Sequence, residues 1–227
     1  MNKRRRASFA LTVMIAATIA GLYLWWMAAH WQPLLADFPF QGPGVSAEQG
    51  VVEWPVVQAG GATFAYATAT MGATGRDAMF EANWRALYAA GLGRGALHIY
   101  SLCQKAVEQG NNFNAVVPRN NDALPAAIEI DFQPGCAARP SRAAVIGEVN
   151  QLLALMESHT GQPVLLKISR QMEQHYHLSQ ALRRPLWSMR NFFPPHYAAR
   201  PWRLWQASDM RRVDGISTPV PWNVVTP

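Results

Sequence analysis

The chain of 227 residues is long enough for one large domain or two small ones, and half of its residues are hydrophobic. This composition excludes a disordered chain and fits a globular domain with an additional membranous segment. The formal net charge of +6 falls to about +2 once the four basic residues at positions 3–6 are set aside. Such a balance gives no support for nucleic acid as a partner.

The N-terminal segment predicts a membrane-spanning helix. The basic residues Lys3–Arg6 precede an uncharged stretch, Ala7–Ala29, whose helix would be about 34 Å long and could cross a hydrocarbon core. The positive-inside rule keeps residues 1–6 in the cytoplasm as a basic head. The rest of the chain is then expected outside the cytoplasm, in the periplasm, anchored to the inner membrane.

A cleaved signal peptide is the alternative reading of the same segment. The apolar run is longer than an ordinary signal peptide has, and the bulky Trp25 and Trp26 stand where a small-residue cleavage site would be needed. These features favour a retained signal anchor at residues 7–29, followed by a linker at residues 30–41.

Strand-like and helix-like patterns alternate beyond the linker. The expected strands are 63–67, 96–100, 127–132, 164–168, 186–189 and 203–206, and the expected helices are 77–90, 106–116, 142–159 and 171–182. Repeated alternation predicts parallel strands with crossover helices, which a barrel or an open sheet would both satisfy. In either architecture functional residues gather at the carboxyl ends of the strands.

One apolar stretch, Leu124–Phe132, carries two carboxylates near its end. In a strand, Glu129 and Asp131 share one face, with Cα atoms about 7 Å apart, while Ile128 and Ile130 point to the other. Carboxylates are costly to hold against apolar neighbours, so the pair suggests acid/base chemistry or a cation site. A solvated strand end fits the spacing equally well.

The chain has two cysteines, Cys103 and Cys136. An oxidising compartment would let them pair, and two separate buried thiols are the alternative. Neither has the spacing of a metal ligand. On the predicted helix His175 and His177 face different directions, which favours surface residues over metal ligands. We therefore expect no metal and no cofactor.

Taken in order, these segments resemble the glycoside hydrolase family 25 lysozymes, the Chalaropsis-type muramidases. The resemblance runs from about Gly42 to Val225 and rests on Val45-Ser46, Gln49-Gly50, Trp54, Phe64-Ala65-Tyr66, Asp77, Phe80, Asn83, Ala90-Gly91-Leu92, Gly95-Ala96, His98, Glu108-Gln109, Phe113, Leu124-Pro125, Glu129, Asp131, Leu186-Trp187, Trp205-Gln206, Gly215-Ile216 and Asn223. It implies an α/β fold, an incomplete TIM-like (β/α) barrel at residues 42–227, whose strand ends form a groove for peptidoglycan glycan strands. It also implies hydrolysis of the bond between N-acetylmuramic acid and N-acetylglucosamine.

The resemblance also implies roles for particular residues. Asp131 would be the proton donor and Glu129 a positioning or base group. The expected substrate contacts are the polar and aromatic residues His98, Tyr100, Trp187, Trp205, Gln206 and Asn223. Cys103 and Cys136 follow neighbouring strands of the resembled barrel, so their loops should meet on the face of the site and form a disulfide.

The departures from the family pattern favour a second hypothesis. The family strand reads Asp-x-Glu, whereas this chain has Glu129 before Asp131. Gly44 and Pro221 stand at two further Asp positions. The family's Lys-Ala-Thr-Glu-Gly appears as residues 68–72, Thr-Ala-Thr-Met-Gly, which loses a charge of each sign. The alternative to a lysozyme is therefore a catalytically inactive peptidoglycan-binding or envelope scaffold protein on the same fold.

Overall fold

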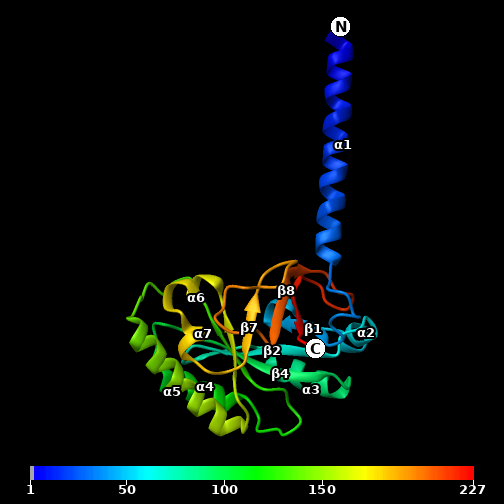
Figure 1. Cartoon of the computed structure of the whole chain (residues 1–227). Coiled ribbons are helices and arrows are strands. Elements are labelled where there is room, and N and C mark those ends of the chain that lie inside the picture. Colours follow the sequence, from blue (N-terminus) through cyan, green and yellow to red (C-terminus); the bar gives the residue numbers. More distant parts are fainter. Residues whose placement is uncertain (1–2) are drawn as a thin grey trace.

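The computed structural model describes residues 3–227, so the first two residues of the expected basic head lie outside the described residues. Beyond a long N-terminal helix, the chain forms a mixed α/β domain around one sheet (Figure 1). The strands are β1 (Gln41–Val45), β2 (Phe64–Met71), β3 (Gly75–Arg76), β4 (Gly93–Ile99), β5 (Ala127–Ile130), β6 (Leu165–Ile168), β7 (Leu186–Met189), β8 (Leu204–Arg211) and β9 (Val220–Val225).

The sheet closes on itself as a barrel of eight strands. Their order is β1-β9-β8-β7-β6-β5-β4-β2, and the pairing of β1 with β2 completes the ring, while β3 only extends β2. The alternation of elements predicts parallel strands throughout, but β9 runs antiparallel to both β8 and β1. A short connection between β8 and β9 reverses the chain, whereas a parallel neighbour would need a long crossover. A TIM barrel, by comparison, has eight parallel strands, each followed by a helix.

The helices are α1 (Lys3–His30), α2 (Trp54–Ala59), α3 (Phe80–Ala89), α4 (Ala106–Val116), α5 (Arg142–Thr160), α6 (Arg170–Tyr176) and α7 (Leu178–Ala181). Apart from α1, they all lie between β1 and β7 in the chain. The helix predicted at 171–182 is instead two helices, because His177 between them adopts a left-handed backbone with φ of 48°. No helix lies between β7 and β8 in the described chain.

Alternation along the strands separates two apolar layers. Inside the barrel, one cluster contains Phe64, Tyr66, Leu97, Ala127, Leu165, Trp187 and Leu204. Outside it, between the strands and the helices, lies a larger cluster that includes Ile128 and Ile130 of β5 and Leu166 and Ile168 of β6. Successive strand residues point to opposite faces, so the residues between these outward pairs project into the barrel.

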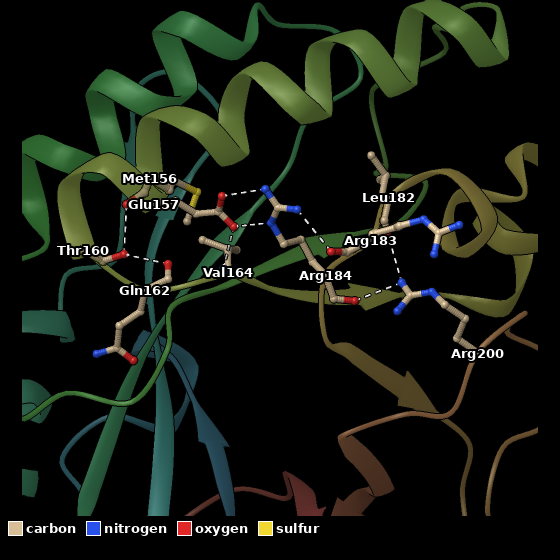
Figure 2. Close-up of polar contacts among 9 residues, drawn as sticks. All are labelled: Met156, Glu157, Thr160, Gln162, Val164, Leu182, Arg183, Arg184 and Arg200. Atoms are coloured by element: carbon tan, nitrogen blue, oxygen red, sulfur yellow. Dashed lines mark hydrogen bonds and ion pairs between the residues drawn. The ribbon is translucent and has the colours of Figure 1, made fainter.

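An ion-paired brace fixes the end of the barrel where β6 and β7 begin (Figure 2). Glu157 of α5 accepts hydrogen bonds from Arg184 Nε at 2.5 Å and Nη2 at 2.9 Å, and from the backbone N–H of Val164 at 3.0 Å. Burial alone would raise the pKa of the Glu157 carboxyl, but the hydrogen bonds from Arg184 and Val164 outweigh it and leave the pKa below its ordinary value. Arg200 joins the same loop by donating to the carbonyl oxygens of Leu182 and Arg184.

Helix α1 projects away from the barrel (Figure 1). Its segment Ala10–His30 is long and apolar enough to cross a membrane, and residues 10–27 of it are exposed. At its carboxyl end the helix is fixed to the barrel, since the backbone N–H of Arg212 donates to the carbonyl oxygen of Ala29 at 2.7 Å. The length and composition of α1 are those expected for the predicted anchor.

Candidate active site

The carboxyl ends of β5, β6, β7 and β8 lie at one end of the barrel because these strands pair in parallel. We call this end the mouth and define it by the interior-facing residues Glu129, Lys167, Gln206 and Asn223. Glu129 projects inward because its neighbours in β5, Ile128 and Ile130, belong to the outer apolar layer.

Lys167 of β6 is the partner of Glu129. The two residues are paired across the strands, and Lys167 Nζ donates to Glu129 Oε2 at 2.7 Å. The Lys167 side chain is 6% exposed and that of Glu129 is 23% exposed, so solvent screens this ion pair only weakly. The ammonium also lies 4.9 Å from the centre of the Trp187 ring on β7, a cation–π contact. The mouth therefore contains a carboxylate held in one place by a buried cation.

Asp131 is the first residue after β5, which ends at Ile130. Its Oδ1 accepts a hydrogen bond from the backbone N–H of Phe132 at 2.8 Å, and the residue is half-buried. The loop that follows is linked to the loop after β4 by a disulfide between Cys103 and Cys136, with Cα atoms 5.9 Å apart. The predicted disulfide is thus confirmed, and it restrains the segment immediately beyond Asp131.

Two other expected substrate contacts also face the interior. Gln206 of β8 projects inward because Trp205 and Ala207 on either side of it pack in the outer layer, and it keeps 8% of its surface exposed. Asn223 of β9 lies opposite Gln206 in the ladder and is fully buried. Its Nδ2 donates to the carbonyl oxygen of Gly42 at 3.2 Å, while its Oδ1 has no hydrogen-bond partner among the described residues.

The two positions at which the family pattern has aspartates are neighbours in space. A Cβ atom placed on Gly44 would lie 3.6 Å from Cβ of Pro221 and 3.7 Å from Nδ2 of Asn223, which is ordinary van der Waals contact. The chain therefore lacks both carboxylates on the same side of the mouth, in strands β1 and β9.

His98 lies away from the mouth. The prediction makes it a substrate contact, but it is fully buried between β4 and α4. Its Nδ1 lies 2.7 Å from Thr70 Oγ1 and its Nε2 lies 3.2 Å from Gln109 Oε1. Burial lowers the pKa of His98 to about 4, with the hydrogen bond to Gln109 opposing the change. With no exposed surface, the imidazole joins a strand to a helix and does not reach the mouth.

Tyr100 and Trp205, the next two predicted substrate contacts, belong to the outer apolar layer and are about 2% exposed. Burial raises the pKa of Tyr100, which packs beneath the loop after β4. Trp205 packs its ring 5.8 Å from that of Phe38 and donates from Nε1 to the carbonyl oxygen of Arg190 at 2.7 Å. Trp187 faces the interior but is 1% exposed, so it supports Lys167 and has no free face for a sugar ring.

Lys167 is a mouth residue that is not among the site residues predicted from the sequence. The strand that contains it is predicted at 164–168, but its partner Glu129 lies 38 positions earlier. The available signal is a single lysine inside an otherwise apolar strand, because a lysine held among apolar neighbours requires an opposite charge. Within residues 3–227, no three His, Cys, Asp or Glu side chains lie close enough together to hold a metal ion.

The model of glycosyl hydrolases family 25 matches residues 44–216, which is most of the barrel domain. The chain belongs to this family. Among curated proteins, it is 29% identical over 196 residues to the protein YegX of Escherichia coli K12, covering 83% of this chain and 70% of that protein. The predicted family resemblance is confirmed.

Solved structures agree with the family 25 assignment. A bacterial lysozyme from Streptomyces coelicolor superposes with a TM-score of 0.74 at 28% identity, covering 82% of this chain and 91% of that one. A family 25 glycosyl hydrolase from Bacillus anthracis gives a TM-score of 0.78 at 24% identity, covering 86% and 92%. The second likeness, at its lower identity, supports the fold alone.

Proposed function

We propose that the protein is a lysozyme-type glycoside hydrolase that cleaves the bond between N-acetylmuramic acid and N-acetylglucosamine in peptidoglycan. The observation that carries the proposal is the position of Glu129, inside a family 25 barrel near the carboxyl end of β5. Asp131 is the first residue after that strand. Active sites of such barrels are built at the carboxyl ends of the strands, and a pair of carboxylates is the usual equipment for glycoside hydrolysis.

Asp131 and Glu129 are assigned different roles. The ion pair with Lys167 suits Glu129 to a role as an ionised group, either a base or a residue that positions the substrate. Asp131 has no cationic partner among the ion pairs of the described residues, so it is assigned as the proton donor to the leaving oxygen. Gln206, which keeps some exposed surface at the mouth, is the remaining candidate for a substrate contact.

A second candidate function is a peptidoglycan-binding or envelope scaffold protein without catalysis. The specific observation in its favour is the absence of a carboxylate at both Gly44 and Pro221, which lie next to each other. The reversed order of Glu129 and Asp131 also moves each carboxyl group by about one methylene, and a misplacement of about 1 Å can cost about 100-fold in rate.

We also propose that α1 is retained as an inner-membrane anchor with its N-terminus in the cytoplasm. Its apolar segment Ala10–His30 has 21 residues, a length of about 31 Å, close to the thickness of a hydrocarbon core. The barrel would then lie on the periplasmic side, where it meets peptidoglycan. A mature N-terminus beyond residue 30, found in membrane-free extract, would show a cleaved signal peptide instead.

Digestion of purified peptidoglycan separates the two functions. The full chain, purified in detergent, is incubated with sacculi, and released fragments are identified by mass spectrometry. A lysozyme releases fragments with N-acetylmuramic acid at the new reducing end. A scaffold protein releases none but sediments together with the sacculi. The double variant Glu129→Asp with Asp131→Glu, which restores the family order, should leave the release unchanged or raise it.

A further inference from the structure

Helix α1 and the mouth lie at the same end of the barrel. The last residue of β8, Arg211, donates from Nη1 to the carbonyl oxygen of His30 at 3.2 Å, so α1 ends beside the carboxyl end of β8. The strands β5 to β8 are parallel, so the carboxyl end of β8 is at the same end of the barrel as the mouth residues Glu129 and Lys167. Figure 1 shows α1 rising from this side, toward which the arrow of β7 points.

The joint between α1 and the barrel is built from several contacts of different kinds. The last carbonyl groups of a helix have no partner within it, and here those of Ala29 and His30 accept hydrogen bonds from Arg212 and Arg211. The Ala29 side chain is 1% exposed. A joint that caps the helix and buries its last turn sets a fixed direction for α1 relative to the barrel.

Aromatic side chains extend this joint on both sides. The ring of Trp31 lies 5.3 Å from that of Phe192, in the loop after β7, and 6.3 Å from that of Trp205 on β8. The ring of Trp25, on α1, has its centre 5.7 Å from the guanidinium of Arg212, the residue that follows β8. Tryptophan is enriched at the membrane interface, and arginine attracts anionic headgroups, so this contact fits the level of the lipid surface.

The part of β8 beyond Gln206 sets the distance between the mouth and the end of α1. Arg211, beside the end of α1, lies five positions after Gln206 at the mouth. At about 3.3 Å per residue, five steps along the strand cover about 16 Å. The paired ends of β8 and β9 therefore act as a spacer between the mouth and the end of the apolar helix.

We propose that the mouth faces the membrane across a gap of about 16 Å, and that its substrate is glycan lying within that gap, close to the lipid surface. The choice of glycan rests on the proposed function, whereas the orientation rests only on α1 being an anchor. A gap of this size admits a polymer chain but excludes a folded domain. Glycan strands that lie further from the membrane would be out of reach of an enzyme held this way.

Energy transfer to labelled lipids tests the orientation. A fluorescent amino acid is introduced at Phe193, exposed on the mouth side, or at Arg183, exposed near the start of β7 at the opposite end. Each full-length variant is reconstituted into vesicles of anionic phospholipid that carry an acceptor dye on the headgroup. We expect clearly higher transfer from position 193 than from position 183. Equal transfer from both, or a reversed order, would overturn the proposal.

Two further measurements distinguish a wrong orientation of the barrel from a failure of α1 to insert into the membrane. A probe at Ile19, exposed on α1, should be quenched by nitroxide-labelled lipid, which verifies insertion in the same vesicles. Trp31→Ala should loosen the joint and reduce the difference between the two probe positions. A quenched Ile19 probe with equal transfer from 193 and 183 refutes the orientation alone.

Substrate reach is tested with glycan oligomers coupled to phospholipid through spacers of different length. The oriented enzyme should cleave those on short spacers faster than those on long ones. Cleavage restricted to long spacers would contradict the proposal. If no oligomer is cleaved while the probe at 193 still shows the higher transfer, the proposed hydrolase function fails and the orientation stands.

Discussion

Lys167 and Glu129 face each other across β5 and β6 inside the barrel, with Nζ 2.7 Å from Oε2. The charge pair places a cation in contact with one of the two candidate catalytic carboxylates. It also accounts for the otherwise costly burial of a lysine whose side chain is 6% exposed. The pair is thus both a structural element of the mouth and part of its chemistry.

Removal of the Lys167 charge should destabilise the protein. Lys167→Met leaves Glu129 largely buried and unpaired, and loss of one partner of a buried pair costs about 3–5 kcal/mol. Because Glu129 keeps some contact with solvent, we expect a smaller loss, about 2 kcal/mol, in urea unfolding of the full chain in detergent. The double variant Glu129→Gln with Lys167→Met should recover most of that loss. If the single variant is as stable as the wild type, the pair has no structural role.

His98 should make the stability depend on pH. Its pKa is about 4 in the folded protein and 6.5 in the unfolded chain, so between these values the unfolded state binds more protons. The free energy of unfolding is therefore highest above about pH 6.5 and falls as the pH drops toward 4, by at most about 3 kcal/mol. His98→Gln should flatten this dependence in urea unfolding measured from pH 7 to pH 4. His196→Gln, at an exposed position, is the matched control and should leave the dependence intact. A slope that His98→Gln leaves unchanged would assign the effect to other groups.

Gly44 and Gly42 lie two positions apart in β1, and a side chain should be tolerated at Gly44 but not at Gly42. A Cβ on Gly44 makes only ordinary contacts, whereas one on Gly42 would overlap the carbonyl oxygen of Phe64. Gly44→Ala should change the free energy of unfolding by less than about 1 kcal/mol, and Gly42→Ala should reduce it by several kcal/mol. Both are measured by urea unfolding. Equal stability of the two variants would contradict the described packing of β1.

Gly44→Asp should raise the rate of glycan release. The carboxylate would lie near Nδ2 of Asn223, a hydrogen-bond donor already in place, and would restore one of the two missing acids. Release of fragments from sacculi is compared with that by Gly44→Asn, which has the same shape without the charge. An increase for both variants, or for neither, would show that the missing charge does not limit activity.

The sequence predicts the part of the site that depends on local alternation. Ile128 and Ile130 pack outward as expected. Glu129, which alternates with them along the strand, therefore points inward. Whether the side chains of His98, Tyr100 and Trp205 point into the barrel or outward depends on how each strand is oriented within it. That orientation is set by register with neighbouring strands, which no single segment contains.

Pairing between segments that are far apart in the chain explains the other features that the sequence does not predict. The ion pair of Lys167 with Glu129 joins residues 38 positions apart, and neither segment alone signals it. Strand β9 contains Pro221 and β1 contains Pro43, which weaken a strand pattern in the sequence. Both strands form because each pairs with neighbours when the barrel closes.

Catalysis by Asp131 is tested by measuring the release of fragments with N-acetylmuramic acid at the reducing end. The wild-type full chain and Asp131→Asn are incubated with the same sacculi, and the fragments are quantified by mass spectrometry. We predict release by the wild type and none above background by the variant, because an amide cannot donate the catalytic proton. Co-sedimentation with sacculi should be equal for both proteins. Equal release by Asp131→Asn and wild type would contradict the assignment of Asp131 as the proton donor.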